Sequence, residues 1–179
     1  RALLRNWLVV YVSNFVGAGA TAALVVLSGR LSAGDGSVGV RAMATADAKG
    51  GLAFGEAIVS GVLANCLVCL AVWMTLSART LTDKVLVIVP PVAAFVAAGF
   101  EHSVANMYFF PAALLHREWA GDDFWAVTGA APDQFTDLGW GEFLLDNLVP
   151  VTIGNIVGGA VLVGLVYWFV YRSRAAQPD

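Results

Sequence analysis

The stretch VLVIVPPVAAFVAAGFEHSVANMYFFPAALL, residues 85–115, decides how this chain folds. A straight helix crosses the hydrocarbon core of a bilayer with about 20 apolar residues, and this run is about ten residues longer. It also contains residues that interrupt a regular helix, namely Pro90, Pro91, Gly99 and Pro111. The excess length and the internal breakers predict a membrane helix that is split in two, with the break at Gly99–Ser103.

Apolar runs with the length of a membrane crossing also occupy residues 7–28, 52–76 and 147–171. The chain is 59 % hydrophobic and 13 % charged, whereas soluble domains carry about 25 % charged residues. Its mean hydropathy is +0.75. We therefore predict an all-α integral membrane protein, with a single transmembrane domain over residues 1–179. A polar, glycine-containing stretch connects the first two spans, at residues 29–50.

The sequence also excludes several classes of function. It has no cluster of Lys and Arg with interleaved aromatic residues of the kind that binds nucleic acid. It has no histidine pair at zinc-ligand spacing, no nucleophile elbow and no phosphate-binding loop. We therefore expect no enzyme activity, no cofactor and no metal site. Cys66 and Cys69 lie inside an apolar helical run, where we expect them to pack as small hydrophobic residues.

The basic residues predict the orientation of the spans. One side of the membrane receives Arg1, Arg5, Arg79, Lys84, Arg172 and Arg174. The other side receives Arg30, Arg41, Lys49 and Arg117, together with the acidic residues Asp35, Asp47, Glu118, Asp122, Asp123, Asp133, Asp137, Glu142 and Asp146. Because Lys and Arg in short flanks mark the cytoplasmic side, we expect both ends of the chain in the cytoplasm.

The first and last spans resemble each other, although they run in opposite directions. SNFVGAGATAALVVL, from Ser13, aligns with GNIVGGAVLVGLVYW, from Gly154, so that Asn14 matches Asn155 and Gly17 matches Gly158. Such a pattern is typical of the inverted repeats that enclose the substrate path of many transporters. Because the middle spans lack counterparts upstream, we expect a whole protein of about six crossings, of which this chain holds a part. Gly17, Gly158 and Gly159 are expected to pack helices closely.

Glu101 and His102 are ionisable residues in the middle of the broken span. Such residues are costly in hydrocarbon and normally face the interior of a bundle or a water-filled path. An unwound segment is tolerated at this depth only within protein or beside a cavity. The half-helix that begins near Ser103 would present amide groups that attract anions. Alternatively, His102 satisfies a buried carbonyl group or Glu101 within a packed bundle.

Other polar residues leave two interpretations open. Asn65 and Asn155 either form hydrogen bonds between helices or line a path. Lys49, at the outer end of a span, either extends its ammonium group to water or raises the anion concentration in an outer vestibule. His116 lies at the end of a span, where we expect it to be exposed.

Five segments resemble the formate/nitrite transporter family, and within it the formate transporter (FocA) type. They are NWLVVYVSNFVGA from Asn6, TADAKG from Thr45, ANCLVCLAVWM from Ala64, GFEHSVANMYFFP from Gly99 and DNLVPVTIGNIVGG from Asp146. The resemblance implies a homopentamer of aquaporin-like protomers in the bacterial inner membrane, each with six spans and its own pore. This chain would hold the third to sixth spans and lack the first two.

The resemblance also implies roles for individual residues. His102 resembles the central pore histidine, and Lys49 resembles the vestibule lysine. Asn65 and Asn155 resemble asparagines that line the pore or bind the histidine. The hydrophobic constrictions correspond to Val68 and Phe95, and Glu101 and Asn106 belong to the histidine motif without a defined role.

The function expected from these residues is a channel for formate and related small monovalent anions, pH-dependent or proton-coupled through His102. Two alternatives remain open. One is a nitrite or hydrosulfide channel of the same family. The other is a membrane-anchor subunit without a pore.

Overall fold

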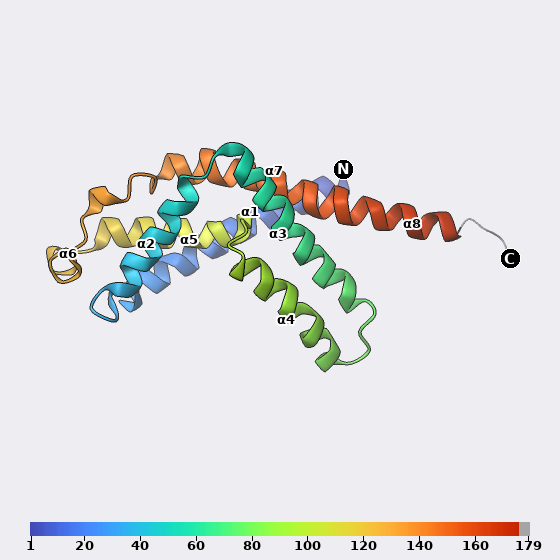
Figure 1. Ribbon diagram of the computed structural model, residues 1–179, viewed down its shortest axis with the longest axis horizontal. Helices are drawn as coiled ribbons and strands as arrows, with labels where there is room; N and C mark the ends of the chain where they lie inside the picture. Colours follow the sequence, from blue (N-terminus) through green and yellow to red (C-terminus); the bar gives the residue numbers. More distant parts are fainter. Residues whose placement is uncertain (176–179) are drawn as a thin grey trace. The chain divides into compact units, whose positions relative to one another are not determined.

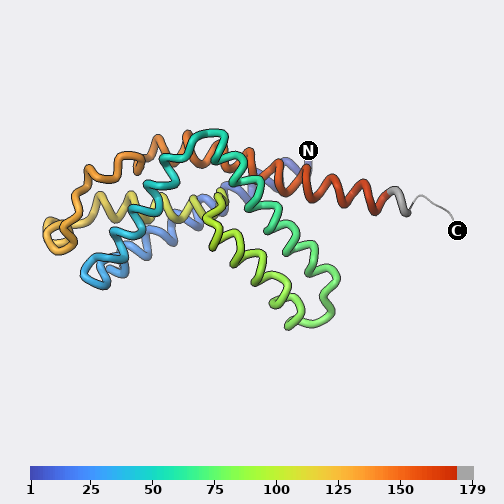
Figure 2. Tube along the Cα trace, viewed as in Figure 1, coloured from blue at the N-terminus to red at the C-terminus, as the bar shows by residue number. Residues whose placement is uncertain are grey.

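The computed structural model describes residues 1–175, with side chains described as far as Arg172 (Figure 1). The last residues of the expected polar tail, 176–179, lie outside the described residues. The chain divides into two compact units, each built from two separate stretches of sequence. Unit 1 contains Arg1–Ala53 and Ser103–Leu148, and unit 2 contains Phe54–His102 and the chain from Val149 onward. Figure 2 traces the chain through both.

Unit 1 is a helical bundle in which α1 and α2 both pack against α5 (Figure 1). Its helical elements are α1 (Ala2–Leu27), η1 (Arg30–Ser32), α2 (Ser37–Gly50), α5 (Ser103–Trp119), α6 (Asp122–Thr128), η2 (Pro132–Gln134) and the π-helical η3 (Glu142–Leu148). Phe143 is fully buried in its core. The Phe143 ring stacks on Phe110 at 5.0 Å and on Phe15 at 6.2 Å between ring centroids. This aromatic stack fixes η3 against α1 and α5.

Helix α2 lies in the stretch that the sequence indicated only as a polar connection. Its buried residues are Gly39, Met43, Ala46 and Gly50. They recur at intervals of four, three and four residues, which places them on one face of a helix. The mean hydropathy of the stretch hides this face because polar and charged residues, among them Arg41, Asp47 and Lys49, occupy other positions of the helix.

Unit 2 is held together by close contacts between α3 and the C-terminal helix. Its elements are α3 (Phe54–Thr75), α4 (Leu81–Ala97), α7 (Val149–Ile156), the π-helical η4 (Val157–Leu165) and α8 (Val166–Ala175). A Cβ atom on Gly154 would collide with the carbonyl oxygen of Ile58, and one on Gly158 with that of Val62. Close packing is therefore confirmed for Gly158, whereas a Cβ atom on Gly17 would meet nothing within 4 Å.

The two cysteines pack against this same contact. The Cys66 thiol donates a hydrogen bond to the carbonyl oxygen of Gly158, with an S···O distance of 3.3 Å. A Cβ atom on Gly159 would lie 2.8 Å from the Cys69 sulfur. Both thiols are free. Among the described residues there is no group of three or more His, Cys, Asp or Glu side chains that could hold a metal ion.

The break between α4 and α5 is made by Gly99 rather than by the prolines. Gly99 has a φ angle of +70°, in the left-handed region that glycine adopts at little cost. Pro90 and Pro91 lie inside α4, and Pro111 lies inside α5. The break at Gly99–Ser103 is therefore where the sequence predicted it, although three of the four expected breakers are tolerated within helices.

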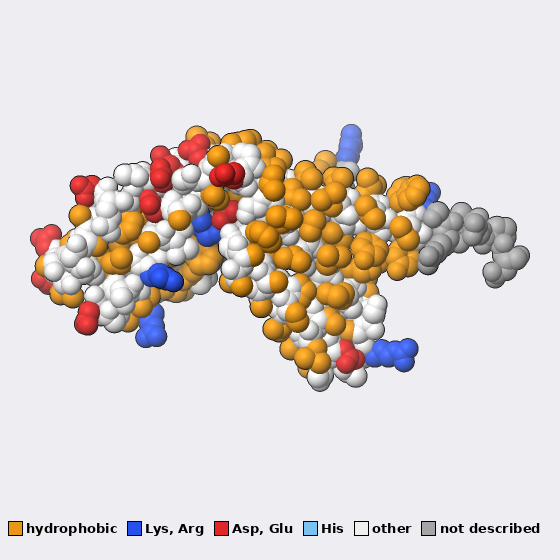
Figure 3. Space-filling view, in the orientation of Figure 1, with side chains coloured by type: hydrophobic (Ala, Val, Ile, Leu, Met, Phe, Trp, Pro, Cys, Tyr) orange, Lys and Arg blue, Asp and Glu red, His pale blue; other side chains and the backbone are white. Residues whose placement is uncertain are grey.

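Within the described residues, three helices are long and apolar enough to cross a membrane: Ala2–Leu27, Phe54–Thr75 and Glu142–Arg172. Helices α4 and α5 have 17 residues each, which is shorter than a full crossing of about 20 residues. In Figure 3, hydrophobic side chains cover most of the visible face of α3 and α4. Such a surface is suited to lipid or to further apolar helices.

Candidate functional site

The broken segment of unit 2 is tied to the neighbouring helices through its backbone. The Glu101 N–H donates to Ser60 Oγ of α3 at 2.9 Å. The Asn155 side chain of α7 donates from Nδ2 to the Glu101 carbonyl at 3.2 Å and to the Gly61 carbonyl at 2.8 Å. An unwound segment loses the hydrogen bonds of a helix, and each buried group left unpaired costs about 1–3 kcal/mol. Ser60 and Asn155 thus replace bonds that the break removes.

The two predicted asparagines belong to one network. Asn65 Nδ2 donates to the backbone carbonyl of Asn155 at 2.6 Å, which joins α3 to α7. Asn155 is buried, whereas Asn65 is half-buried. A Cβ atom on Gly159 would collide with the Asn65 amide, so this glycine makes room for the side chain. Both amides form the interhelical hydrogen bonds that one interpretation of the sequence expected.

His102 lies beside Phe95, with 6.0 Å between the ring centroids and 36° between the ring planes. His102, Phe95 and Val68 are all half-buried, whereas Glu101 is only 2 % exposed. The structure thus brings together His102 and one predicted constriction residue. An open recess of about 380 Å³ is lined by Ser60 and Phe100, and further by Gly55, Glu56, Val59 and Leu63. It borders the broken segment within unit 2.

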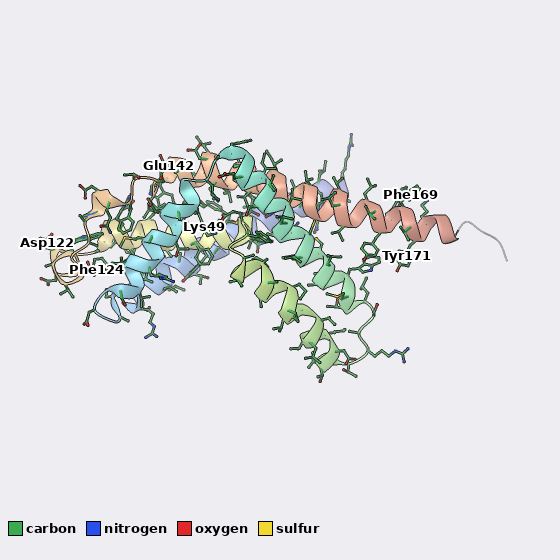
Figure 4. All side chains as sticks on the ribbon, in the orientation of Figure 1. Lys49, Asp122, Phe124, Glu142, Phe169 and Tyr171 are labelled. Carbon is green, nitrogen blue, oxygen red and sulfur yellow. The ribbon has the colours of Figure 1, made fainter. Side chains whose placement is uncertain are left out.

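The remaining predicted site residues, Lys49 and Asn106, belong to unit 1. Asn106 Nδ2 donates to Asn147 Oδ1 at 2.6 Å, and Asn147 Nδ2 donates to the Lys49 carbonyl at 2.9 Å. The Lys49 ammonium lies 5.8 Å from the centroid of the Phe109 ring, where a cation is attracted by the aromatic face. Figure 4 shows Lys49 on α2 beside α5. Lys49 is half-buried, and this is compatible with both interpretations of the sequence.

Two of the residues that build these clusters were missed in the sequence, Ser60 and Asn147. Each is a polar residue inside or at the start of an apolar run, as Asn65 and Asn155 are. The same signal that indicated the predicted asparagines was thus present for both.

The expectation that His116 is exposed was wrong. His116 is 5 % exposed, and its ring meets Phe124 edge-on at 4.7 Å between centroids. A Cβ atom on Gly39 would collide with the His116 ring, so α2 approaches the histidine through a glycine. The short helix α6 folds back over the end of α5 and supplies Phe124, which covers the ring. Burial lowers the pKa of His116, which lies beyond the predicted span.

Both clusters lie in segments that carry the family motifs. A model of the formate/nitrite transporter family matches residues 1–169. The chain belongs to the formate/nitrite transporter family. The formate channel FocA of Escherichia coli (strain K12) is 50 % identical over 169 residues, which are 94 % of this chain and 59 % of that protein. FocA of Haemophilus influenzae is 43 % identical over 172 residues, covering 96 % of this chain and 61 % of that protein.

A solved structure of a formate/nitrite transporter family member supports the fold. A pentameric formate channel with formate bound superimposes with a TM-score of 0.92 at 46 % identity, covering 96 % of this chain and 68 % of that one. The prediction of an all-helical membrane fold of this family is confirmed. The chain spans about three fifths of the length of its curated relatives. These relatives are channels, and this chain is a bacterial membrane protein.

Proposed function

We propose that this chain forms part of a channel for formate and related small monovalent anions in the bacterial inner membrane. The observation that carries the proposal is the broken segment Glu101–His102, held by Asn155 and Ser60. It occurs in a chain that is 46 % identical to a formate channel with formate bound. The whole protein is then a homopentamer of protomers with six spans. This chain contributes one transmembrane domain with four of the spans and a cytoplasmic C-terminus, and it has no enzyme activity.

The proposed path contains an attractive charge and an apolar barrier. The pore and substrate residues are His102, Asn65, Asn155, Lys49, Glu101 and Asn106, and the constrictions contain Phe95 and Val68. Lys49 raises the local concentration of anions. A constriction of apolar side chains opposes a charged anion because it offers nothing in place of the hydration shell.

His102 is the proposed proton donor at this barrier. A histidine changes its charge near neutral pH, so His102 is suited to hold formate as an imidazolium ion. Transfer of its N–H proton to a carboxylate oxygen leaves neutral imidazole and neutral formic acid. The neutral acid passes the apolar constriction at a much lower desolvation cost. The position of the Phe95 ring beside the His102 ring supports a proton donor that acts at the apolar constriction.

Stopped-flow flux of formate, nitrite and hydrosulfide into liposomes that contain the full-length protein tests the proposal. Measurements are made below and above the ordinary histidine pKa of about 6.5. His102→Phe should abolish the pH dependence of formate flux, whereas the control His116→Gln should retain it. An unchanged profile in His102→Phe would refute the proton role. Absence of flux for all three anions would refute the channel and favour a membrane anchor.

A further inference from the structure

We propose that Asn147 is a positioning residue for the Lys49 ammonium group and thereby sets the affinity of the outer vestibule for formate. This inference rests on the proposed function, because it assumes that Lys49 acts on the transported anion. Asn147 itself is fully buried, and the resemblance to the family implied no role for it.

Asn147 caps the end of the helix that carries Lys49. The last carbonyl groups of an α-helix have no partner within the helix, and α2 ends at Gly50. Asn147 Nδ2 supplies a partner for one of them, the carbonyl of Lys49, at 2.9 Å. The terminal turn of α2 is thus bonded to the side chain of a residue almost 100 positions away, with a sequence separation of 98.

The same amide connects this turn to the helix that carries the aromatic partner of Lys49. Asn147 Oδ1 accepts a hydrogen bond from Asn106 Nδ2 at 2.6 Å, and Asn106 is also fully buried. Phe109 lies three residues further along α5, and its ring faces the Lys49 ammonium at 5.8 Å. Asn147 therefore links the backbone of Lys49 to the helix that supplies the ring beneath its charge.

Asn147 lies in an element that is firmly packed within unit 1. It belongs to η3, whose Phe143 is fully buried in the aromatic stack of unit 1. The loop before η3 also holds α2, because the Asp137 N–H donates to Asp47 Oδ1 at 2.8 Å. Asp47 and Lys49 are charged residues in the last turn of α2, and Asp137 packs against this turn. A side chain at position 147 must both donate a hydrogen bond to the Lys49 carbonyl and accept one from Asn106 Nδ2 if it is to connect them.

Two substitutions of Asn147 test this requirement, because they remove different hydrogen-bonding groups. Asn147→Leu removes both hydrogen bonds. Asn147→Asp keeps the shape, and its carboxylic acid form donates an O–H to the Lys49 carbonyl while still accepting from Asn106. The carboxylate form only accepts. Low pH favours the acid form and high pH favours the carboxylate form, so one variant compares a side chain that donates with one that cannot. The matched control is Asn6→Asp, which changes an exposed asparagine of the same unit.

The experiment measures formate flux against formate concentration in liposomes with the full-length protein, at a low and a high pH. Each value is divided by that of the unmodified protein at the same pH. If the Lys49 ammonium group no longer attracts formate, the half-saturating formate concentration should rise about tenfold. We expect this rise for Asn147→Leu at both pH values and for Asn147→Asp at high pH only, with no change in Asn6→Asp.

A double substitution separates positioning from general damage. In a Lys49→Met background, Asn147→Asp should cause no further rise in the half-saturating concentration, because its effect passes through the lysine. An equal rise in the half-saturating concentration in the Lys49→Met background overturns the proposal. So does a half-saturating concentration that equals that of the unmodified protein in both Asn147 variants. A loss of maximal flux without any change in the half-saturating concentration overturns it as well. If Asn147→Leu does not assemble, Asn147→Asp carries the test. Absence of formate flux in the unmodified protein overturns the proposed function, and this inference with it.

Discussion

Replacement of Gly99 by alanine should destabilise the protein through the backbone alone. Gly99 has a φ angle of +70°, and a Cβ atom at this position would meet nothing within 4 Å. The left-handed conformation costs an L-residue with a Cβ atom about 1–2 kcal/mol, and no collision adds to it. Such a change lowers the ratio of folded to unfolded protein by a factor of about 5–30.

Asparagine and a second glycine provide the controls. Asparagine enters the left-handed region more readily than alanine, so Gly99→Asn should cost less than Gly99→Ala. Gly55 lies at the start of α3, where a Cβ atom also meets nothing and φ is not positive. Gly55→Ala should therefore be neutral or stabilise by about 0.4–1 kcal/mol.

The assay is reversible unfolding of the full-length protein in mixed detergent micelles, followed by circular dichroism. The expected order of stability is Gly55→Ala first, then the unmodified protein, then Gly99→Asn and finally Gly99→Ala. If Gly99→Ala were as stable as Gly55→Ala, the left-handed turn would not be what separates α4 from α5.

Two further predictions concern a close helix contact at Gly158 and the buried side chain of His116. Gly158→Ala places a Cβ atom against the Val62 carbonyl and should cost about 1–3 kcal/mol through overpacking, measured by the same unfolding assay beside Gly55→Ala. Equal stability of the two variants would show that α3 and η4 separate freely. For His116, burial lowers the pKa, so the unfolded chain binds the proton more readily than the folded one. Stability is therefore lost as the pH falls from about 6.5 toward the lowered pKa of the folded protein. His116→Gln should flatten the pH dependence of the free energy of unfolding below about pH 6.5. An unchanged slope in this range would show that His116 is not the group whose protonation destabilises the protein.

Much of the fold could be predicted because the membrane imposes a simple rule. Apolar runs of about 20 residues indicated α1, α3 and the C-terminal helix, since a lipid environment requires length and apolar character above all. The break near Gly99 was also visible, because its residues departed from that rule. The prolines were harder to interpret, since a helix supported by its neighbours tolerates a missing N–H group.

What the sequence did not reveal depends on contacts between distant segments. Helix α2 was missed because its buried face consists largely of small residues, whose burial is decided by the approach of α5. His116 was expected at the surface because Phe124, which covers it, lies on a separate short helix. Asn147 acquires its importance from two hydrogen-bond partners, Lys49 and Asn106, that are far from it in the sequence.

The contact of Gly159 with Asn65 and Cys69 has an evolutionary consequence. These residues share one volume, because a Cβ atom on Gly159 would occupy space already filled by the Asn65 amide and the Cys69 sulfur. A larger residue at position 159 is therefore compatible with the fold only if the side chains at positions 65 and 69 both become smaller or move away. Across the family, we expect these three positions to vary together. The hydrogen bond from Asn65 to the Asn155 carbonyl should be absent wherever position 159 carries a side chain.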